Sequence, residues 1–157
     1  MAAINLERIL VPVDFSGSSD GALRYAVSLA EAFGANLHLL HVVERPVEQQ
    51  WAAELAMVAA IDVEAEARAK SDAALSELLT KAERERFAAQ MVTLTGAPFA
   101  EIVRYARREN IDLIVMGTHG RAALAHLLIG SVAENVVRKA PCPVLTVPTA
   151  GHDFVKP

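Results

Sequence analysis

Short apolar runs alternate with longer segments of helical character along the chain. The apolar runs are rich in Val, Ile and Leu and lack helical spacing, which is typical of strands buried on both faces of a sheet. Such runs occur at residues 8–13, 36–43, 87–94, 113–116 and 141–147, the third being the weakest. Pro12 lies near the end of the first run, where a strand tolerates a missing N–H group. The pattern therefore predicts five strands.

The segments between these runs predict helices. Ser18 or Ser19 can cap the first helix, and Gly34 ends it. The segment Val47–Glu85 contains no Gly or Pro and is rich in Ala, Glu, Lys and Leu, which favours helix throughout. Its inward stripe is predicted to consist of Ala65, Ala69, Ala73, Leu75, Leu78 and Leu79. A third helix opens at Ala97-Pro98 and closes at Asn110, and a fourth runs through Arg138 and Lys139.

Strict alternation of strands and helices predicts the fold class. It is typical of α/β domains with a mostly parallel sheet and helices on both faces. We expect a single domain at residues 1–150, followed by a C-terminal tail at 151–157. In such sheets, ligands bind beyond the carboxyl ends of the strands, where the strand order reverses. The loops after the first and fourth strands are therefore expected to form one site.

The loop after the fourth strand carries a glycine pattern, G-x2-G-x9-G-S. Gly117, Gly120, Gly130 and Ser131 occupy its fixed positions. Glycines permit positive φ and close approach of the backbone to a ligand. The amides of Ser131 and Val132, at the start of a helix, are suited to an anion such as phosphate. The pattern with its flanking strand and helix predicts a nucleotide-binding loop.

Charge and composition narrow the function further. The net charge of -4 over 157 residues disfavours a nucleic-acid binder, which would present a basic face. The single cysteine, Cys142, excludes an internal disulfide and is expected to be a buried strand residue. No apolar run reaches the roughly 20 residues of a membrane span. We expect a cytoplasmic protein without a membrane segment. The chain has neither a G-x-x-x-x-G-K-[ST] phosphate loop nor a G-x-G-x-x-G fingerprint after the first strand.

These motifs together resemble the universal stress protein family. The resemblance rests on the glycine pattern between LIVMG and PCPVLTV, on ILVPVDFS in the first strand and on LLHVV in the second. It implies a Rossmann-like (adenine nucleotide alpha-hydrolase-like) fold, a homodimer, and binding of ATP (or AMP or ADP). The segment Val47–Ile61 is variable in that family, so the resemblance assigns no residue there.

The resemblance also assigns site residues. Pro12, Val13 and Asp14 are implied on the adenine and ribose side, with Val42 against the base. The residues implied at the ribose and phosphates are Met116, Gly117, His119, Gly120, Gly130, Ser131 and Val132. Asp14 is a candidate to hold Mg²⁺ through water.

Several alternatives remain open from the residues alone. Asp14 can instead be a helix-capping residue. His38 and His41 alternate with apolar strand positions and are expected in the core or an interface. The rival hypothesis is an enzyme that uses the same site, either a slow ATPase or a protein that autophosphorylates on Ser131 or a neighbouring hydroxyl. A response-regulator receiver is excluded because its acidic cluster and phosphoacceptor Asp are missing, with Thr95-Gly96 at the latter place.

The last strand also predicts an interface. Val144–Val147 is apolar, and an apolar strand at a sheet edge needs a cover. Antiparallel pairing of this strand across a two-fold axis would bury it, and the family resemblance implies the same homodimer.

Overall fold

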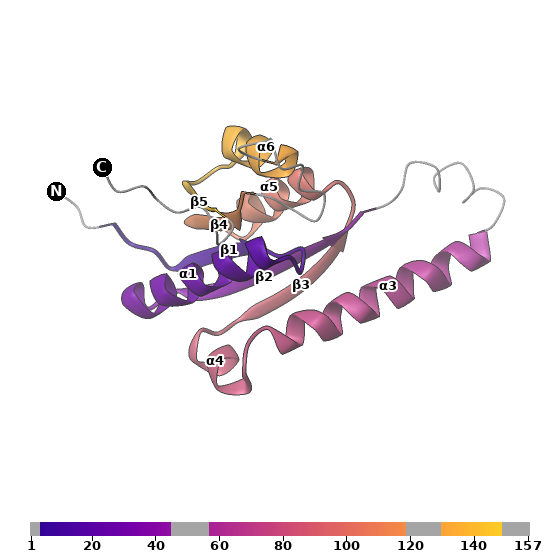
Figure 1. Cartoon of the computed structure of the whole chain (residues 1–157), viewed down its shortest axis with the longest axis horizontal. Coiled ribbons are helices and arrows are strands. Elements are labelled where there is room, and N and C mark those ends of the chain that lie inside the picture. Colours follow the sequence, from indigo (N-terminus) through magenta and orange to yellow (C-terminus); the bar gives the residue numbers. More distant parts are fainter. Residues whose placement is uncertain (1–3, 45–56, 119–129, 149–157) are drawn as a thin grey trace.

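The chain folds around a single five-stranded parallel sheet. The structure is a computed structural model, and it describes residues 4–44, 57–118 and 130–148. Its strands are β1 (Arg8–Pro12), β2 (Asn36–Val43), β3 (Gln90–Thr95), β4 (Leu113–Gly117) and β5 (Val144–Val147). Their order in the sheet is β3-β2-β1-β4-β5, and every neighbouring pair is parallel (Figure 1). The predicted α/β fold class is confirmed. The expected tail and residues 47–56 of the variable segment lie outside the described residues.

Helices cover both faces of the sheet. They are α1 (Gly17–Phe33), α3 (Met57–Glu77), α4 (Lys81–Arg86), α5 (Pro98–Arg108) and α6 (Ser131–Lys139). The core on one face packs β1 and β2 side chains against α1 and the C-terminal part of α3. The core on the other face packs Leu10, Leu40 and Ile114 against α5 and α6. Figure 1 shows α5 and α6 together on one side, with α3 and α4 on the other.

The first helix begins earlier than the sequence predicted. Its N-cap is Ser16, whose side chain accepts a hydrogen bond from the amide of Ser19. Ser18 and Ser19 lie inside the first turn and are buried. The prediction that one of them caps the helix was wrong, because several serines in a row offer equivalent caps and the turn after β1 selects among them. Gly34 ends α1 in a left-handed conformation, as predicted.

The long helical segment is interrupted. Helix α3 ends at Glu77, and Thr80 starts α4 with a capping box in which its side chain and that of Glu83 bond each other's backbone amides. The prediction of continuous helix to Glu85 was wrong there, since a Thr-x-x-Glu capping box begins a new helix.

The predicted inward stripe of α3 was wrong for its alanines. Ala65, Ala69 and Ala73 are exposed, whereas Leu75 and Leu79 are buried and Leu78 is half-buried. Alanine is a strong helix former that buries little area, so its positions carry little information about which side faces the core. The C-terminal third of α3 is anchored in the core through leucines, and the helix continues past the end of the sheet (Figure 1).

His38 is a core residue, as predicted. It is buried on β2, and its Nδ1 lies 2.9 Å from the hydroxyl of Tyr105 on α5. Burial lowers the pKa of His38 below its ordinary value and raises the pKa of Tyr105 to about 12. Desolvation disfavours the charged form of each group. The pair therefore joins β2 to α5 as neutral partners.

Cys142 differs from its prediction. It precedes β5 and is half-buried against the core formed with α5 and α6. Burial raises the pKa of its thiol, which favours the neutral form. Its place outside the strand follows from the prolines on either side, which cannot donate to a sheet ladder.

Candidate functional site

The loops that follow β1 and β4 are brought together by the sheet order. β1 pairs directly with β4, with Ile9 opposite Leu113 and Leu10 opposite Ile114. Because both strands run in the same direction, their carboxyl ends lie side by side. The chain turns from β1 toward α1 on one face and from β4 toward α6 on the other face. A site at this point has access to both helix N-termini.

A cavity of about 1010 Å³ lies at these carboxyl ends. It takes residues from the ends of β1, β2 and β4 and from α1, α3, α5 and α6. The described lining residues are Pro12, Val13, Asp14, Phe15, Ser19, Leu40, His41, Val42, Val43, Glu44, Ala67, Lys70, Ser71, Ala74, Pro98, Ile102, Met116, Gly117, Thr118, Gly130, Ser131, Val132 and Ala133. The cavity is large enough for a mononucleotide, since ligand pockets run from about 300 to 1,000 Å³.

Most of the site residues predicted from sequence lie at this cavity. Those that line it are Pro12, Val13, Asp14, Val42, Met116, Gly117, Gly130, Ser131 and Val132. The other two, His119 and Gly120, lie outside the described residues. Segments far apart in the sequence are thus gathered into one place, as expected from the fold class.

Gly117 lines the cavity, and it also has a packing role that the glycine pattern did not predict. A Cβ built on it would lie 2.2 Å from the Oγ of Ser18 and 2.9 Å from the backbone carbon of Ser18. Its backbone is not in the left-handed region, so the expected positive φ was wrong. Gly117 therefore allows the first turn of α1 to pack directly against the end of β4.

The first turn of α6 presents three amides that have no acceptor among the described residues. The N–H of Gly130 donates to the carbonyl of Thr118 at 2.6 Å, and the first backbone bond of the helix runs from Glu134 to Gly130. Between these two lie the amides of Ser131, Val132 and Ala133, which have no acceptor within their helix. Gly130 is the N-cap and supplies no side-chain acceptor. Within the described residues, these amides remain available at the cavity wall.

The turn after β1 is held by Asp14. Its Oδ1 accepts hydrogen bonds from the amide of Ser16 at 3.1 Å and from the Oγ of Ser16 at 2.5 Å. Asp14 therefore orients the residue that caps α1, and the alternative that Asp14 is itself the cap is wrong. Phe15, between them, adopts a φ of 61°. A bulky residue is uncommon in that region, and such outliers concentrate at functional sites.

His41 lines the cavity, which its predicted core or interface role did not specify. It is half-buried, its Nδ1 lies 2.7 Å from the carbonyl oxygen of Val13, and its ring centroid lies 4.7 Å from that of Phe15. A carbonyl only accepts, so Nδ1 carries the proton and Nε2 of the neutral ring is an acceptor. The sequence offered no signal for this position, because side chains alternate between the faces of a strand and His41 is therefore expected on the face opposite to Val42.

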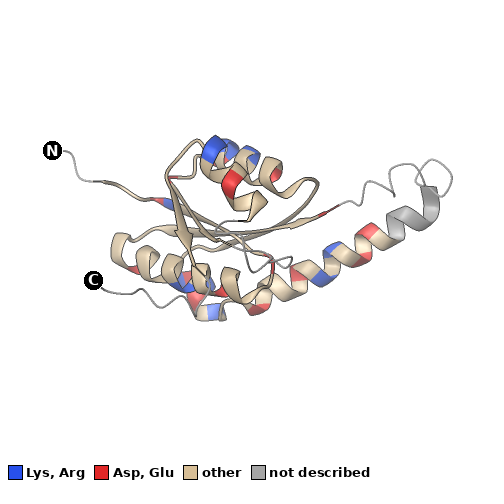
Figure 2. Ribbon diagram, turned by 45° about the horizontal axis from the view of Figure 1, so that its top comes forward, with Lys and Arg blue, Asp and Glu red and all other residues tan. Residues whose placement is uncertain are grey.

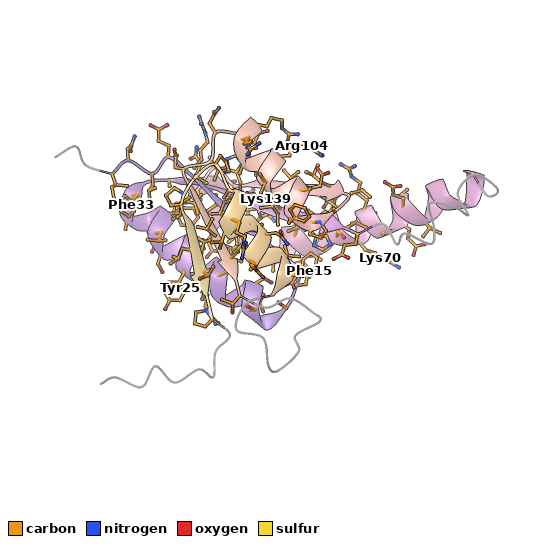
Figure 3. All side chains as sticks on the ribbon, turned by 90° about the horizontal axis from the view of Figure 1, so that it is seen from above. Phe15, Tyr25, Phe33, Lys70, Arg104 and Lys139 are labelled. Atoms are coloured by element: carbon orange, nitrogen blue, oxygen red, sulfur yellow. The ribbon has the colours of Figure 1, made fainter. Side chains whose placement is uncertain are left out.

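Helix α3 contributes a wall that sequence reasoning missed. Ala67, Lys70, Ser71 and Ala74 line the cavity from this helix. Their spacing of i, i+3, i+4 and i+7 places them on one helix face. Phe15 and Lys70 lie toward the same end of the molecule, away from Phe33 (Figure 3). The sequence pattern at these four positions is a weak signal, because three small residues and one lysine are equally typical of a helix face exposed to solvent.

Over residues 4–44, 57–118 and 130–148, no three His, Cys, Asp or Glu side chains gather as a metal-binding group. In the same ranges, no helix combines the length and the apolar character needed to cross a bilayer.

The comparisons with known proteins agree on one family. A model of the universal stress protein family matches residues 5–148. The chain is 34% identical over 147 residues to universal stress protein MJ0531 of Methanocaldococcus jannaschii, covering 90% of this chain and 81% of that protein. It is 31% identical over 159 residues to universal stress protein MJ0577 of the same organism, covering 92% of this chain and 96% of that protein.

Solved structures share the fold. The structure of MJ0577 matches with a TM-score of 0.74 and 31% identity, covering 92% of this chain and 97% of that chain. A universal stress protein in complex with cAMP matches with a TM-score of 0.63 and 26% identity, covering 94% of this chain and all of that chain (100%). The family model spans every strand of the sheet, and both relatives align over most of their length. The chain belongs to the universal stress protein family.

Proposed function

We propose that this protein binds an adenine nucleotide in the cavity at the carboxyl ends of β1, β2 and β4, as a nucleotide-dependent regulatory module in the cytoplasm. The observation that carries the proposal is the first turn of α6, whose amides at Ser131, Val132 and Ala133 lie at the cavity wall and have no acceptor among the described residues. A helix N-terminus favours an anion through these amides and through its dipole. The related structure in complex with cAMP supports a nucleotide as the ligand class.

The proposed pose follows from the two ends of the cavity. The phosphates lie against α6, with the Ser131 hydroxyl as an additional donor. The base and ribose lie toward Val42, Pro12 and the Asp14 turn, where apolar side chains can cover a ring and a carboxylate can accept from a ribose hydroxyl.

Mg²⁺ is suited to this arrangement only as a companion of the nucleotide. It commonly keeps several waters and binds through one or two carboxylates plus substrate phosphates. The described lining offers the carboxylates of Asp14 and Glu44, and Oδ1 of Asp14 already accepts two hydrogen bonds from Ser16. Asp14 would hold the ion through water, and the ion would supply charge neutralisation for the phosphates.

Binding is tested directly on protein freed of co-purified small molecules. We expect isothermal titration to give saturable, one-site binding of Mg-ATP, with ADP and AMP competing. A parallel phosphate-release assay distinguishes a binding module from the slow ATPase of the rival hypothesis. Failure to bind any adenine nucleotide at millimolar concentration would contradict the proposal, whereas steady release of phosphate would support the rival.

We also propose that two copies pair through β5. This strand lies at the edge of the sheet, and Leu145 on it is 38% exposed. Two more exposed apolar side chains, Tyr25 and Val137, come from α1 and α6, the helices that flank β5. An unpaired edge with apolar neighbours is a template for pairing with a second chain.

The dimer is tested by Leu145→Lys. A lysine on an edge strand blocks edge-to-edge pairing because its charge would be buried there. We expect light scattering at micromolar concentration to give the mass of a dimer for the wild-type chain and that of a monomer for the variant. Val63→Lys is the control, since Val63 is exposed and belongs to α3, which packs on β2 and β3 toward the sheet edge opposite β5. A monomeric wild-type protein would overturn the proposal.

A further inference from the structure

The residues of α3 that line the cavity belong neither to the glycine pattern nor to the loop after β1. Ala67, Lys70, Ser71 and Ala74 form one face of this helix at the cavity. Below them, Leu75 and Leu79 are buried in the core, so the helix is anchored beside the wall. The small side chains of Ala67 and Ala74 leave space between α3 and the end of β2, where His41 and Val43 line the same cavity.

Lys70 gives this wall its charge. Among the cavity-lining residues in the described part of the chain, it is the sole Lys or Arg. Its Nζ lies 2.7 Å from Oε1 of Glu66, one turn earlier on α3, and its side chain is 76% exposed. Exposed pairs at this spacing contribute little, so the ammonium can leave Glu66 for a ligand at small cost. Charges of both signs follow α3 (Figure 2), but Glu66 itself does not line the cavity.

The wall and the α6 amides lie on opposite faces of the sheet. Helix α3 packs on β2 and β3 on the face covered by α1, whereas α6 packs beside α5 on the other face. A nucleotide with its phosphates at α6 extends along the strand ends toward β2. Its base then reaches the space beside His41 and the α3 wall. The Ser71 hydroxyl already donates to the carbonyl of Ala67 at 2.9 Å, which leaves Lys70 as the donor on this face.

We infer that Lys70 contacts the base and donates a hydrogen bond to a ring nitrogen of the bound adenine, in the space left by Ala67 and Ala74. This inference rests on the proposed function and adds a residue to the base end of the site. In this arrangement α3 contacts the base, while α6 holds the phosphates.

The first experiment compares Lys70→Met with Lys81→Met. Lys81 is the matched control, because it is 83% exposed on α4, pairs with Glu85 four residues later and does not line the cavity. In Lys70→Met, the loss of one hydrogen bond is expected to lower the affinity for ATP and the affinity for adenosine by the same factor, about three- to tenfold. Lys70→Arg keeps a donor and is expected to retain more affinity than Lys70→Met, and Lys81→Met is expected to match the wild type.

The second experiment fills the space. Ala67→Leu is expected to lower the affinities for ATP and adenosine by the same factor. Ala69→Leu, on the exposed side of the same helix, is expected to leave both affinities unchanged. Circular dichroism confirms that each variant is folded.

The outcomes separate the two proposals. Wild-type binding with unchanged affinity in Lys70→Met and Ala67→Leu overturns the inference and leaves the proposed function standing. A loss in Lys70→Met for ATP but not for adenosine also overturns it, because Lys70 then contacts phosphate. No binding of either ligand by the wild-type protein overturns the proposed function, and the inference fails with it.

Discussion

Replacing Ser131 with proline is expected to weaken ATP binding by about 10- to 100-fold, as the loss of charge-assisted hydrogen bonds to phosphate predicts. Proline removes both the hydroxyl and the amide of this residue, which is the first residue of α6. The fold is expected to tolerate the change, because proline is favoured at the first position of a helix. The preceding residue, Gly130, has φ -69° and ψ 154°, a conformation that is compatible with a following proline. Isothermal titration of the two proteins measures the difference.

Ser131→Ala separates the two groups that proline removes. It deletes the hydroxyl and keeps the amide, so we expect a smaller loss of affinity than in Ser131→Pro. If the two variants bind equally well, the amide of residue 131 does not contact the phosphates. If Ser131→Pro binds as tightly as the wild type while its thermal unfolding is unchanged, the phosphates do not lie at the start of α6.

Replacing Gly117 with valine is expected to lower the free energy of unfolding by about 3 kcal/mol or more, since overpacking typically costs 1–3 kcal/mol and here part of the clash is with backbone. Even the first added carbon would lie 2.2 Å from the Oγ of Ser18 and 2.9 Å from its backbone carbon. The first turn of α1 would have to move away from β4. Chemical denaturation followed by circular dichroism measures the change in the absence of any nucleotide.

Two further variants make the Gly117 test specific. Gly17→Ala is the control, because no atom lies within 4 Å of a Cβ at that helical position. We expect it to be neutral or slightly stabilising. Ser18→Gly added to Gly117→Ala removes part of the obstruction and is expected to recover part of the lost stability, a coupling that a double-mutant cycle measures. Unchanged stability in Gly117→Val would show that this glycine serves the ligand and not the packing.

Gly117 and Ser131 differ in a way that the sequence motif does not predict. Gly117 and Ser131 belong to one pattern in the sequence, and both were assigned to the nucleotide. In the structure, both residues line the cavity, and Gly117 also allows α1 to pack closely against β4. The amide of Ser131 has no acceptor among the described residues. The spacing of the pattern does not reveal which backbone groups are already occupied. The bond from Gly130 to Thr118, for example, depends on how close the end of β4 and the start of α6 lie in the fold.

In the helical segment before β3, the sequence predicts the secondary structure but not the side of the helix that faces the protein. Its helical character was predictable from composition, because Ala, Glu, Lys and Leu all favour helix. The face that the helix turns toward the protein was not predictable, since the alanines at 65, 69 and 73 are exposed and those at 67 and 74 line the cavity. The difference in burial free energy between two alanines is too small for a sequence pattern to display.

The sequence by itself determined the five strands, their alternation with helices, the parallel α/β class, the family and the two loops that meet at the strand ends. These features depend on local periodicity and on turn residues, which a linear pattern records. Only the tertiary structure decided the helix start at Ser16, the contact of Gly117 with Ser18, and the places of His41 and Lys70 at the cavity. Those features arise where α1, α3 and the ends of different strands meet, because the close approach of distant segments depends on how whole elements pack.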